Sequence, residues 1–239
     1  MKVWWLGNAH GRGNFGDILT PTILDYFNVD YDYVGHYFDA DAVCVGSIAR
    51  RAGPGVTVLG SGIISESDRL FANADWKFVR GPYTKKRVEF FGGNCPAIYG
   101  DPALLLPLIV EPSDKENDVG IVAHNIDINW ALEQYRDSNV IGLGTRDCKT
   151  VIDKITKCNK IISSSLHGII CAHAYGIPAA WVKSNRKLKG DNIKFKDYFA
   201  SIGVEDPVMS TYDEPVFIDP PNKIDLDPII EIFEGLEKI

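Results

Sequence analysis

The segment from Ser163 to Val182 places a histidine between a predicted strand and a predicted helix. An apolar pair at 161–162 gives way to three serines, His167 and a glycine, and a second apolar stretch then runs to the turn at 175–178. A third short apolar run follows, so the order predicts strand, turn, helix, turn and strand. In open parallel sheets, ligands bind beyond the strand ends, and helix N-termini there favour anions. The segment therefore predicts an α/β fold together with a site at His167.

Short apolar runs recur along the whole chain. They do not alternate with polar residues, which is typical of parallel strands covered on both faces; examples are residues 3–6, 42–45, 56–59, 97–99, 119–123 and 140–143. The charged stretch from Glu111 to Asp118 has the composition of a linker. We therefore expect two consecutive β/α halves facing across a cleft. The N-terminal domain would span 1–112 and the C-terminal domain 113–212, with a tail and helix over 213–239 in position to pack back on the first domain.

Composition and charge exclude several classes of function. The chain has 239 residues, 45% of them hydrophobic, and a formal net charge of -7, which argues against general nucleic-acid binding. No apolar run approaches the ~18 residues of a membrane span, and the run at 3–6 is too short for a signal peptide. The five cysteines are scattered without metal-ligand spacing, so we expect structural thiols, no metal site and a cytoplasmic protein.

A glycine-rich loop follows the first apolar run, from Gly7 to Asp17. Glycines such as Gly13 and Gly16 let backbone N–H groups approach a ligand closely, and Asn14 lies between them. The spacing is not the usual dinucleotide fingerprint directly after the strand, and no Walker lysine follows, so the match to a nucleotide motif is weak. Asp17 begins the next predicted helix, where it is an N-cap or a base that orients an acceptor, and one carboxylate can serve as both.

Two charged residues follow predicted strands in the first half. Arg80 lies between a short strand and a helix that Pro82 opens, which predicts a position at the edge of the cleft. There the guanidinium can bind a carboxylate or a phosphate through two hydrogen bonds, or it pairs with a neighbouring acid at the surface. Asp101 precedes a buried apolar run, and a lone acid there more often caps the following turn than takes part in a site.

Histidines and lysines in the second half supply the remaining candidates. The neighbouring serines can orient His167, and Gly168 leaves access to it open, which favours a function over a packed polar side chain. His124 follows a strand and is a weaker candidate of the same kind. The basic run from Lys183 to Lys196 would usually indicate a solvated face, but Lys194 lies nearest the aromatic residues and is the best candidate to point inward. Together these residues predict an anion-handling site with one acid–base histidine.

Several short motifs stand in a fixed order along the chain. They are Gly13-Asn14-Phe15-Gly16-Asp17, Gly60-Ser61-Gly62, Arg80-Gly81-Pro82-Tyr83-Thr84, Gly100-Asp101-Pro102-Ala103, Ser165-Leu166-His167-Gly168, Tyr175-Gly176-Ile177-Pro178, and Lys194 before Asp197. Together they resemble the polysaccharide pyruvyl transferase family. The resemblance implies two Rossmann-like α/β/α domains in a GT-B-like arrangement, and the transfer of a pyruvyl group from phosphoenolpyruvate to a sugar, which gives a ketal. Many members have arginine before Leu-His-Gly; Ser165 resembles the branch of succinoglycan-type exopolysaccharide pyruvyl transferases.

The resemblance also implies roles for individual residues. His167 would act as the general acid toward the donor, and Asp17 would orient or deprotonate the sugar hydroxyl. The donor site would include Arg80, Lys194, Ser165 and Gly168, and the acceptor side would include Gly13, Asn14, Gly16, Asp101 and His124. No cofactor is implied beyond phosphoenolpyruvate as co-substrate. The acceptor would be a sugar, an oligosaccharide or a lipid-linked saccharide, which allows peripheral association with the inner face of a membrane.

Two other classes of function remain open on the sequence alone. A glycosyltransferase with a nucleotide sugar would use Asp17 as base and the basic loop for a diphosphate. It would also need a carboxylate for the ribose, and Asp191 is the only acid in that loop. A carbohydrate-binding protein on a decayed enzyme scaffold would bind sugar without turnover. The pyruvyl-transfer hypothesis predicts that His167 opens into the cleft near Arg80 and the loop of residues 7–17.

Overall fold

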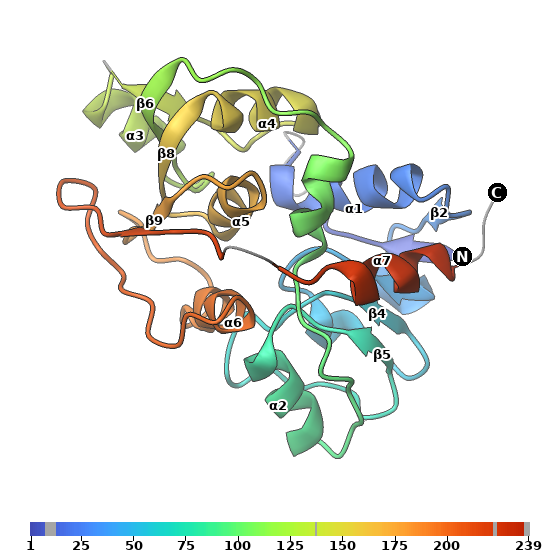
Figure 1. The fold of residues 1–239 in the computed structure, drawn as a ribbon. Helices are drawn as coiled ribbons and strands as arrows, with labels where there is room; N and C mark the ends of the chain where they lie inside the picture. The colour runs from blue at the N-terminus through green and yellow to red at the C-terminus, as the bar shows by residue number, and fades with distance from the viewer. Residues whose placement is uncertain (8–12, 137, 222–223, 237–239) are drawn as a thin grey trace.

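The computed structural model describes residues 1–7, 13–136, 138–221 and 224–236, and it contains two β-sheets with helices packed around them (Figure 1). The first sheet is parallel throughout and has the order β2-β1-β3-β4-β5. Its strands are β1 at Lys2–Trp4, β2 at Asp32–Tyr33, β3 at Ala42–Val43, β4 at Thr57–Leu59 and β5 at Asp75–Phe78. Val3 belongs to one hydrophobic cluster, and Val43 and Val58 belong to another. Both faces of the sheet are therefore covered, which explains why its strands lack alternation.

The second sheet is parallel except at one edge and has the order β10-β9-β8-β6-β7. Its strands are β6 at Asn117–Val122, β7 at Asn139–Ile141, β8 at Cys158–Ser163, β9 at Ala179–Trp181 and β10 at Phe217–Ile218. The edge strand β10 runs antiparallel to β9. The prediction of an α/β fold with mainly parallel sheets is confirmed. The predicted strand at 97–99 is reduced to one parallel bridge between Val79 and Tyr99.

Helices connect the strands within each sheet. They are α1 at Phe15–Tyr26, α2 at Pro82–Phe90, α3 at Ile128–Gln134, α4 at Cys148–Thr156, α5 at Leu166–Ala174, α6 at Ile193–Ser201 and α7 at Asp227–Glu234, with short 3-10 helices η1 at Tyr37–Asp39, η2 at Ala49–Arg51 and η3 at Pro102–Leu108. The sequence of α4 explains its start, because the Asp147 side chain accepts a hydrogen bond from the Thr150 N–H and caps the helix. Val151, Ile152 and Ile155 then lie buried on one face.

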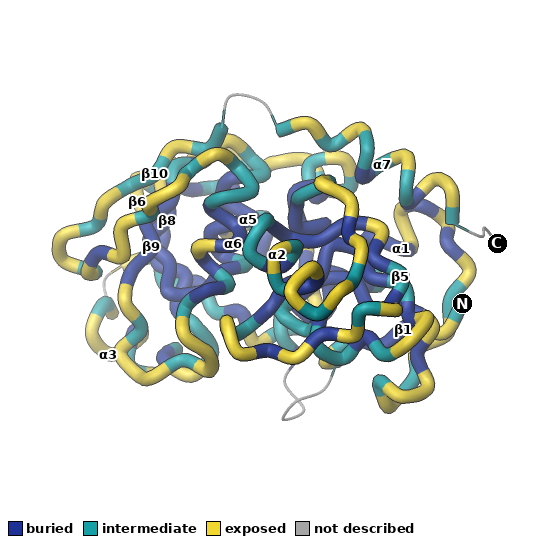
Figure 2. The backbone as a smooth tube through the Cα atoms, turned by 90° about the horizontal axis from the view of Figure 1, so that it is seen from below, coloured by how far each residue is buried: buried dark blue, intermediate teal, exposed yellow. Residues whose placement is uncertain are grey.

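A continuous hydrophobic core joins the two halves of the chain. Helix α5 packs on η3, α1 packs on α4, and α2 packs on α6, so each of these pairs joins an element before residue 113 to one after it. The main core cluster contains Phe15 and Leu105 from the first half, and Ile169 and Phe199 from the second. Figure 2 shows the backbone of α5 and of the neighbouring strands β8 and β9 as mainly buried, whereas α3 lies in a more exposed part of the molecule.

The last described helix returns to the first half. Phe233 of α7 stacks on Phe27 with 5.1 Å between ring centroids and 12° between planes, and its ring meets Phe78 edge-on at 5.9 Å. The chain therefore crosses between the halves twice, once after η3 and once before α7 (Figure 1). Among the described residues, no helix has both the length and the apolar character that a bilayer crossing requires.

Candidate active site

A pocket of about 210 Å³, which we call the central pocket, lies between the two halves. Its walls come from segments that follow β1, β3 and β4 of the first sheet and β6, β7 and β8 of the second. The carboxyl ends of both sheets thus face the same space, which is where parallel α/β sheets bind ligands. Its lining includes polar and titratable side chains, among them Asn14, Asp17, His124, Ser165, His167 and Lys194. Residues 8–12 of the predicted glycine-rich loop lie outside the described residues.

His167 lies in the first turn of α5, and its side chain is 15% exposed. Gly16, in the first turn of α1, lies directly against the imidazole, so that an added Cβ would collide with Nδ1. This contact requires glycine at position 16 and holds the ring between the two helices. It confirms the predicted proximity of His167 to the end of the glycine-rich loop, and it explains Gly16 as a packing residue.

Asp101 lies behind His167 and is completely buried. Its Oδ1 accepts a hydrogen bond from the Ala103 N–H at 3.0 Å, which caps η3, as the sequence favoured. Its Oδ2 lies 3.7 Å from Nε2 of His167. Among the described residues, these two atoms are the buried side-chain nitrogen and oxygen atoms without a hydrogen-bond partner. Because such atoms rarely stay unpaired, a small shift of the ring would join them.

The imidazole of His167 is neutral in this pocket. Burial, together with the positive charges of Arg80 and Lys194, lowers its pKa to about 3. This low pKa does not suit the general-acid role that the resemblance implies, because a general acid must carry its proton at the working pH. Nε2 faces Asp101, whereas Nδ1 packs against Gly16 at the wall of the central pocket. With the proton on Nε2, the lone pair of the neutral ring lies on Nδ1.

Asp17 has the opposite perturbation. It is 8% exposed, and burial raises its pKa to about 7, against the effects of a hydrogen bond from Asn14 and the charge of Lys194. Helix α1 begins at Phe15, and the Asn14 side chain is its N-cap, since Oδ1 accepts from the Gly16 N–H. The Asn14 Nδ2 donates to Asp17 Oδ2 at 2.8 Å. Asp17 is therefore not the cap, and its carboxyl group is held toward the pocket.

Lys194 supplies a cation to the pocket wall, as predicted. It lies in the first turn of α6. Burial and the charge of Arg80, opposed by the charge of Asp17, lower the pKa of its ammonium group to about 8. The ammonium group is therefore mostly charged at neutral pH, and an anion in the pocket would strengthen its preference for the charged form.

Arg80 does not lie at the cleft edge, as the sequence analysis expected, but is completely buried. Its Nε and Nη2 each lie 3.2 Å from Oδ2 of Asp197 in α6, Nη1 donates to Ser47 Oγ, and Nη2 donates to the Ile63 carbonyl. Through these contacts the guanidinium joins α6 to the first half of the chain. Its charge still acts on Asp101 behind His167, because it opposes the effect of burial, which raises the pKa of Asp101 to about 6.

Of the predicted residues Ser165, Gly168 and Gly13, the first lines the central pocket and the two glycines allow close packing. Ser165 is the N-cap of α5 and lines the central pocket. Gly168 does not open the site, because an added Cβ would meet Ser163 Oγ and Val122; it lets α5 approach the sheet instead. Gly13 has a φ of +73° and lies against the backbone of Thr145 from the other half.

His124 joins the pocket from the end of β6. Burial and the charge of Lys194 lower its pKa to about 4. Its backbone N–H donates to Ser164 Oγ at 3.0 Å, and its Nδ1 accepts from the Ile126 N–H. These bonds fix the strand end, and they leave His124 a second neutral histidine on the wall.

Sequence reasoning missed the role of Asp197. This carboxylate is completely buried and accepts hydrogen bonds from Arg80, from the Thr84 N–H at 2.9 Å and from the Thr84 hydroxyl at 2.6 Å. An acid flanked by Phe195, Tyr198 and Phe199 was the available signal, since a buried acid needs partners. Over the part of the chain that the structure describes, no group of three His, Cys, Asp or Glu side chains could hold a metal ion.

Comparisons with known proteins find a family profile and two relatives. A sequence profile described as polysaccharide pyruvyl transferase matches residues 8–186. The uncharacterized protein L143 of Acanthamoeba polyphaga mimivirus is 36% identical over 174 residues, which cover 67% of this chain and 60% of that protein. The succinoglycan biosynthesis protein ExoV of Rhizobium meliloti (strain 1021) is 26% identical over 226 residues, which cover 85% of this chain and 66% of that protein. No solved structure matches the chain significantly.

Proposed function

We propose, from the premise that this chain belongs to the polysaccharide pyruvyl transferase family, that it moves the pyruvyl group of phosphoenolpyruvate onto two hydroxyls of a saccharide. The acceptor would be a sugar of a polysaccharide, an oligosaccharide or a lipid-linked precursor. The observation that carries the proposal is the pairing of Asp17 and His167, whose pKa values are displaced in opposite directions in one pocket beside Lys194.

The reaction balances with two acceptor hydroxyls and no redox step. Each hydroxyl oxygen forms a bond to C2 of phosphoenolpyruvate, and the bond between C2 and the phosphate oxygen breaks. The methylene carbon gains one hydroxyl proton and becomes a methyl group, while the other proton leaves with the phosphate. The site must therefore supply a base for the hydroxyls, an acid for the methylene carbon, and positive charge for the phosphate and carboxylate.

We assign the base to His167 and the acid to Asp17, which reverses the roles that the resemblance first implied. His167 is neutral and lines the central pocket with Nε2 toward Asp101, so Nδ1 would accept a hydroxyl proton while Asp101 stabilises the imidazolium that forms. Asp17, with a pKa of about 7, holds a proton on a substantial fraction of molecules at neutral pH and can deliver it to the methylene carbon.

The negative charge of the bound donor would favour these roles of His167 as base and Asp17 as acid. Phosphoenolpyruvate brings a phosphate and a carboxylate, and negative charge raises the pKa of every neighbouring group. Asp17 would keep its proton, His167 would become a stronger base, and the Lys194 ammonium would be fully charged against the phosphate. Ser165 and the N-terminus of α5 lie on the same wall and would donate hydrogen bonds to the donor's anionic oxygens. Arg80 would contribute charge rather than contact.

His167→Ala tests the assignment directly. Proton transfer of this kind typically contributes ~10²–10⁴-fold, so the variant should release phosphate from phosphoenolpyruvate at least about a hundredfold more slowly in the presence of acceptor. The matched control is His36→Ala, at an exposed histidine outside the central pocket. Both variants should melt close to the wild type. A His167→Ala enzyme with near-wild-type release would contradict the role.

The glycosyltransferase alternative needs a carboxylate that binds the ribose, and Asp191 is already bonded elsewhere. Asp191 accepts hydrogen bonds from Ser65 Oγ and the Glu66 N–H, each at 2.8 Å, so its carboxylate fastens the basic loop to the first half. A thermal-shift comparison separates the hypotheses, since a ligand that binds only the folded state raises its melting temperature. Phosphoenolpyruvate should stabilise the protein more than a nucleotide sugar does. Sugar binding without phosphate release would favour the non-catalytic alternative.

We also propose the setting of this activity. The two sheets would act as Rossmann-like domains of a GT-B-like enzyme, with limits at 1–112 and 113–212 and the helix of the 213–239 tail on the first domain. No cofactor would be needed beyond the donor. The five cysteines are unpaired and buried, which supports a reducing, cytoplasmic compartment. Peripheral association with the inner membrane face would follow if the acceptor is lipid-linked.

A further inference from the structure

A pocket of about 320 Å³, which we call the aromatic pocket, lies where three segments of the second half meet. Trp130 and Tyr135 come from α3 and from the residue that ends it, and Tyr212 comes from the chain just before β10. The third segment, 183–185, begins the loop that joins β9 to α6. The proposed reaction uses none of these aromatic residues.

Three aromatic rings form one continuous cluster in the wall of this pocket. The ring of Trp130 lies 5.8 Å from that of Tyr135 and 5.3 Å from that of Tyr212, edge-on in both cases. The two tyrosine rings lie 5.5 Å apart with 30° between their planes. All three side chains are half-buried, so part of each remains accessible. Because the rings hold one another in place, the cluster presents an ordered aromatic surface to the pocket.

Polar side chains of both charge signs complete the lining. Lys183 and Asp213 are exposed residues of opposite charge, and Asn185 and Thr211 add an amide and a hydroxyl group. Burial, together with the charge and a hydrogen bond of Asp213, raises the pKa of Tyr135, which places Asp213 beside that ring. The lining therefore offers hydrogen-bond donors and acceptors around an aromatic surface without selecting one sign of charge.

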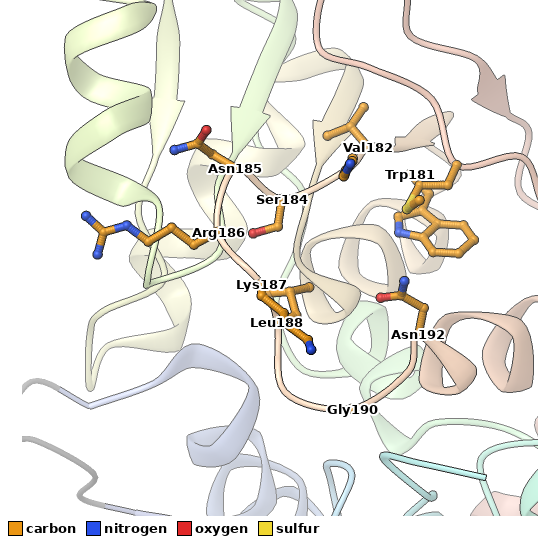
Figure 3. A pocket seen from close by; sticks show the side chains of 11 residues that line it. Trp181, Val182, Ser184, Asn185, Arg186, Lys187, Leu188, Gly190 and Asn192 are labelled. Carbon is orange, nitrogen blue, oxygen red and sulfur yellow. The ribbon is translucent and has the colours of Figure 1, made fainter.

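One buried carboxylate holds the loop that borders the pocket. Asp127 is completely buried, and it accepts hydrogen bonds from the Ser184 hydroxyl, from the Asn185 N–H at 3.0 Å and from the Arg186 N–H at 3.1 Å. The bond to Asn185 uses only its backbone. Figure 3 shows the Asn185 side chain outside the curve of this loop, away from a further pocket that the loop encloses, and the side chain lines the aromatic pocket.

The segment 124–127 contacts the walls of both the aromatic pocket and the central pocket. His124 lines the central pocket, and its N–H donates to Ser164 Oγ, which also accepts from the Tyr212 hydroxyl at 2.9 Å. Asp127, at the other end of the segment, bonds the loop that borders the aromatic pocket. A ligand in the aromatic pocket would therefore bind close to residues that line the central pocket.

We propose that the aromatic pocket binds a sugar residue of the acceptor other than the residue that receives the pyruvyl group. A sugar ring has C–H bonds on its faces, which pack on the electron-rich face of an aromatic ring, and hydroxyl groups around its edge, which need donors and acceptors. The aromatic wall and the mixed polar lining offer both, whereas Asp213 would repel an anionic ligand. The inference rests on the proposed function, which makes a saccharide the acceptor and places its reacting residue in the central pocket.

Binding of neutral tetrasaccharides of glucose, galactose and mannose to the whole chain tests the pocket without any assay of turnover. In calorimetry at least one of them should bind the wild type, and Trp130→Ala should weaken that binding about tenfold, since it removes the largest ring. Asn185→Ala should weaken it about fivefold by removing the amide, and this variant keeps the backbone hydrogen bond to Asp127 that orders the loop. Phe38→Ala is the matched control, because Phe38 is an exposed aromatic residue outside the lining. No binding, or binding that neither pocket variant weakens, would overturn the proposal.

Kinetics with acceptors of two lengths separate this proposal from the proposed function. The tetrasaccharide that binds should have a lower KM than the methyl glycoside of its reacting sugar. Trp130→Ala should raise the KM of the tetrasaccharide about tenfold, whereas Phe38→Ala should not. Equal KM values for the two acceptors in the wild type would overturn the aromatic pocket as an acceptor site while pyruvyl transfer stands. Tetrasaccharide binding that Trp130→Ala weakens, without release of phosphate from phosphoenolpyruvate, would support the pocket and refute the proposed function.

Discussion

Replacing Asp101 by asparagine removes one charge from behind the imidazole and changes almost nothing else. Asparagine has the same shape, and its Oδ1 can still accept the Ala103 N–H that caps η3. The change falls on Oδ2, which lies 3.7 Å from Nε2 of His167. An amide N–H there would favour the tautomer with its proton on Nδ1, and that proton would occupy the position where His167 should accept one.

The size of the effect follows from this distance. When His167 takes a proton, an ion pair with Asp101 forms, and at an effective dielectric constant of about 20 two charges about 4 Å apart attract by about 4 kcal/mol. Since each 1.36 kcal/mol corresponds to a tenfold change in rate, Asp101→Asn should lower kcat by about 10³-fold. The KM for phosphoenolpyruvate should change little, because Asp101 does not line the central pocket.

The free energy of unfolding of Asp101→Asn should rise, although its kcat falls. Burial raises the pKa of Asp101 from 3.8 to about 6, against the effect of Arg80, so the native state binds the proton more tightly than the unfolded state. The stability associated with that proton is present below pH 4 and is lost as the pH rises through 6, at a cost of about 3 kcal/mol. Asparagine carries no such cost, so the variant should melt above the wild type at pH 7 to 8.

The assay is phosphate release from phosphoenolpyruvate with saturating acceptor, with kcat and KM measured separately and the melting temperature recorded. Asp147→Asn is the matched control, because Asp147 also caps a helix but lies at the surface, away from the central pocket. A kcat for Asp101→Asn within tenfold of the wild type would refute the coupling to His167. An equal loss in both variants would attribute the effect to helix capping.

Three further predictions concern other contacts. Gly16→Ala should lower kcat at least tenfold, because the new Cβ would collide with the His167 imidazole. Gly53→Ala is the control and should leave kcat unchanged, because the space at its Cβ position is open. An active Gly16→Ala enzyme with a normal melting temperature would contradict the packing. Asp17→Asn should match the wild type in free energy of unfolding below pH 4 and exceed it by about 4 kcal/mol above pH 7. Burial raises the Asp17 pKa from 3.8 to about 7, so the native wild type loses stability as the pH rises between these values. Urea denaturation of both proteins from pH 4 to 8 measures the difference, and a difference that does not change with pH would disprove the raised pKa. Asp197→Ala should lower the free energy of unfolding by about 3–5 kcal/mol, because Arg80 would remain buried without its partner, and joint replacement of both residues by leucine and methionine should recover most of it in the same denaturation assay.

Elements with a strong local signal could be predicted from the sequence. Strands β4, β8 and β9 and helices α4 and α5 follow from apolar runs ended by glycine, serine or proline, and from helical spacing. Strand β2 could not be predicted, because Asp32 and Tyr33 are both exposed and pair with β1 only through the backbone. The predicted strand at 97–99 failed because its residues find only one bridge partner.

Several side chains that line the central pocket could be predicted from the sequence, but their burial and pKa values could not. His167, Asp17 and Lys194 each follow a strand end or begin a helix, and this position brings them into one pocket. The burial of Arg80 depends on Asp197, which lies 117 positions away in the sequence. The pKa values could not be predicted either, since they arise from burial by both halves.

The second crossing of the chain has a consequence for the order in which the protein can fold. The first sheet is complete in sequence by residue 78, but Phe27 and Phe78 lack their aromatic neighbour until residues 227–234 have left the ribosome. The first half to be synthesised is thus the last to finish its core. Such long-range contacts slow folding and expose apolar surface on the growing chain. A truncation within α7 would therefore harm the half that is translated first.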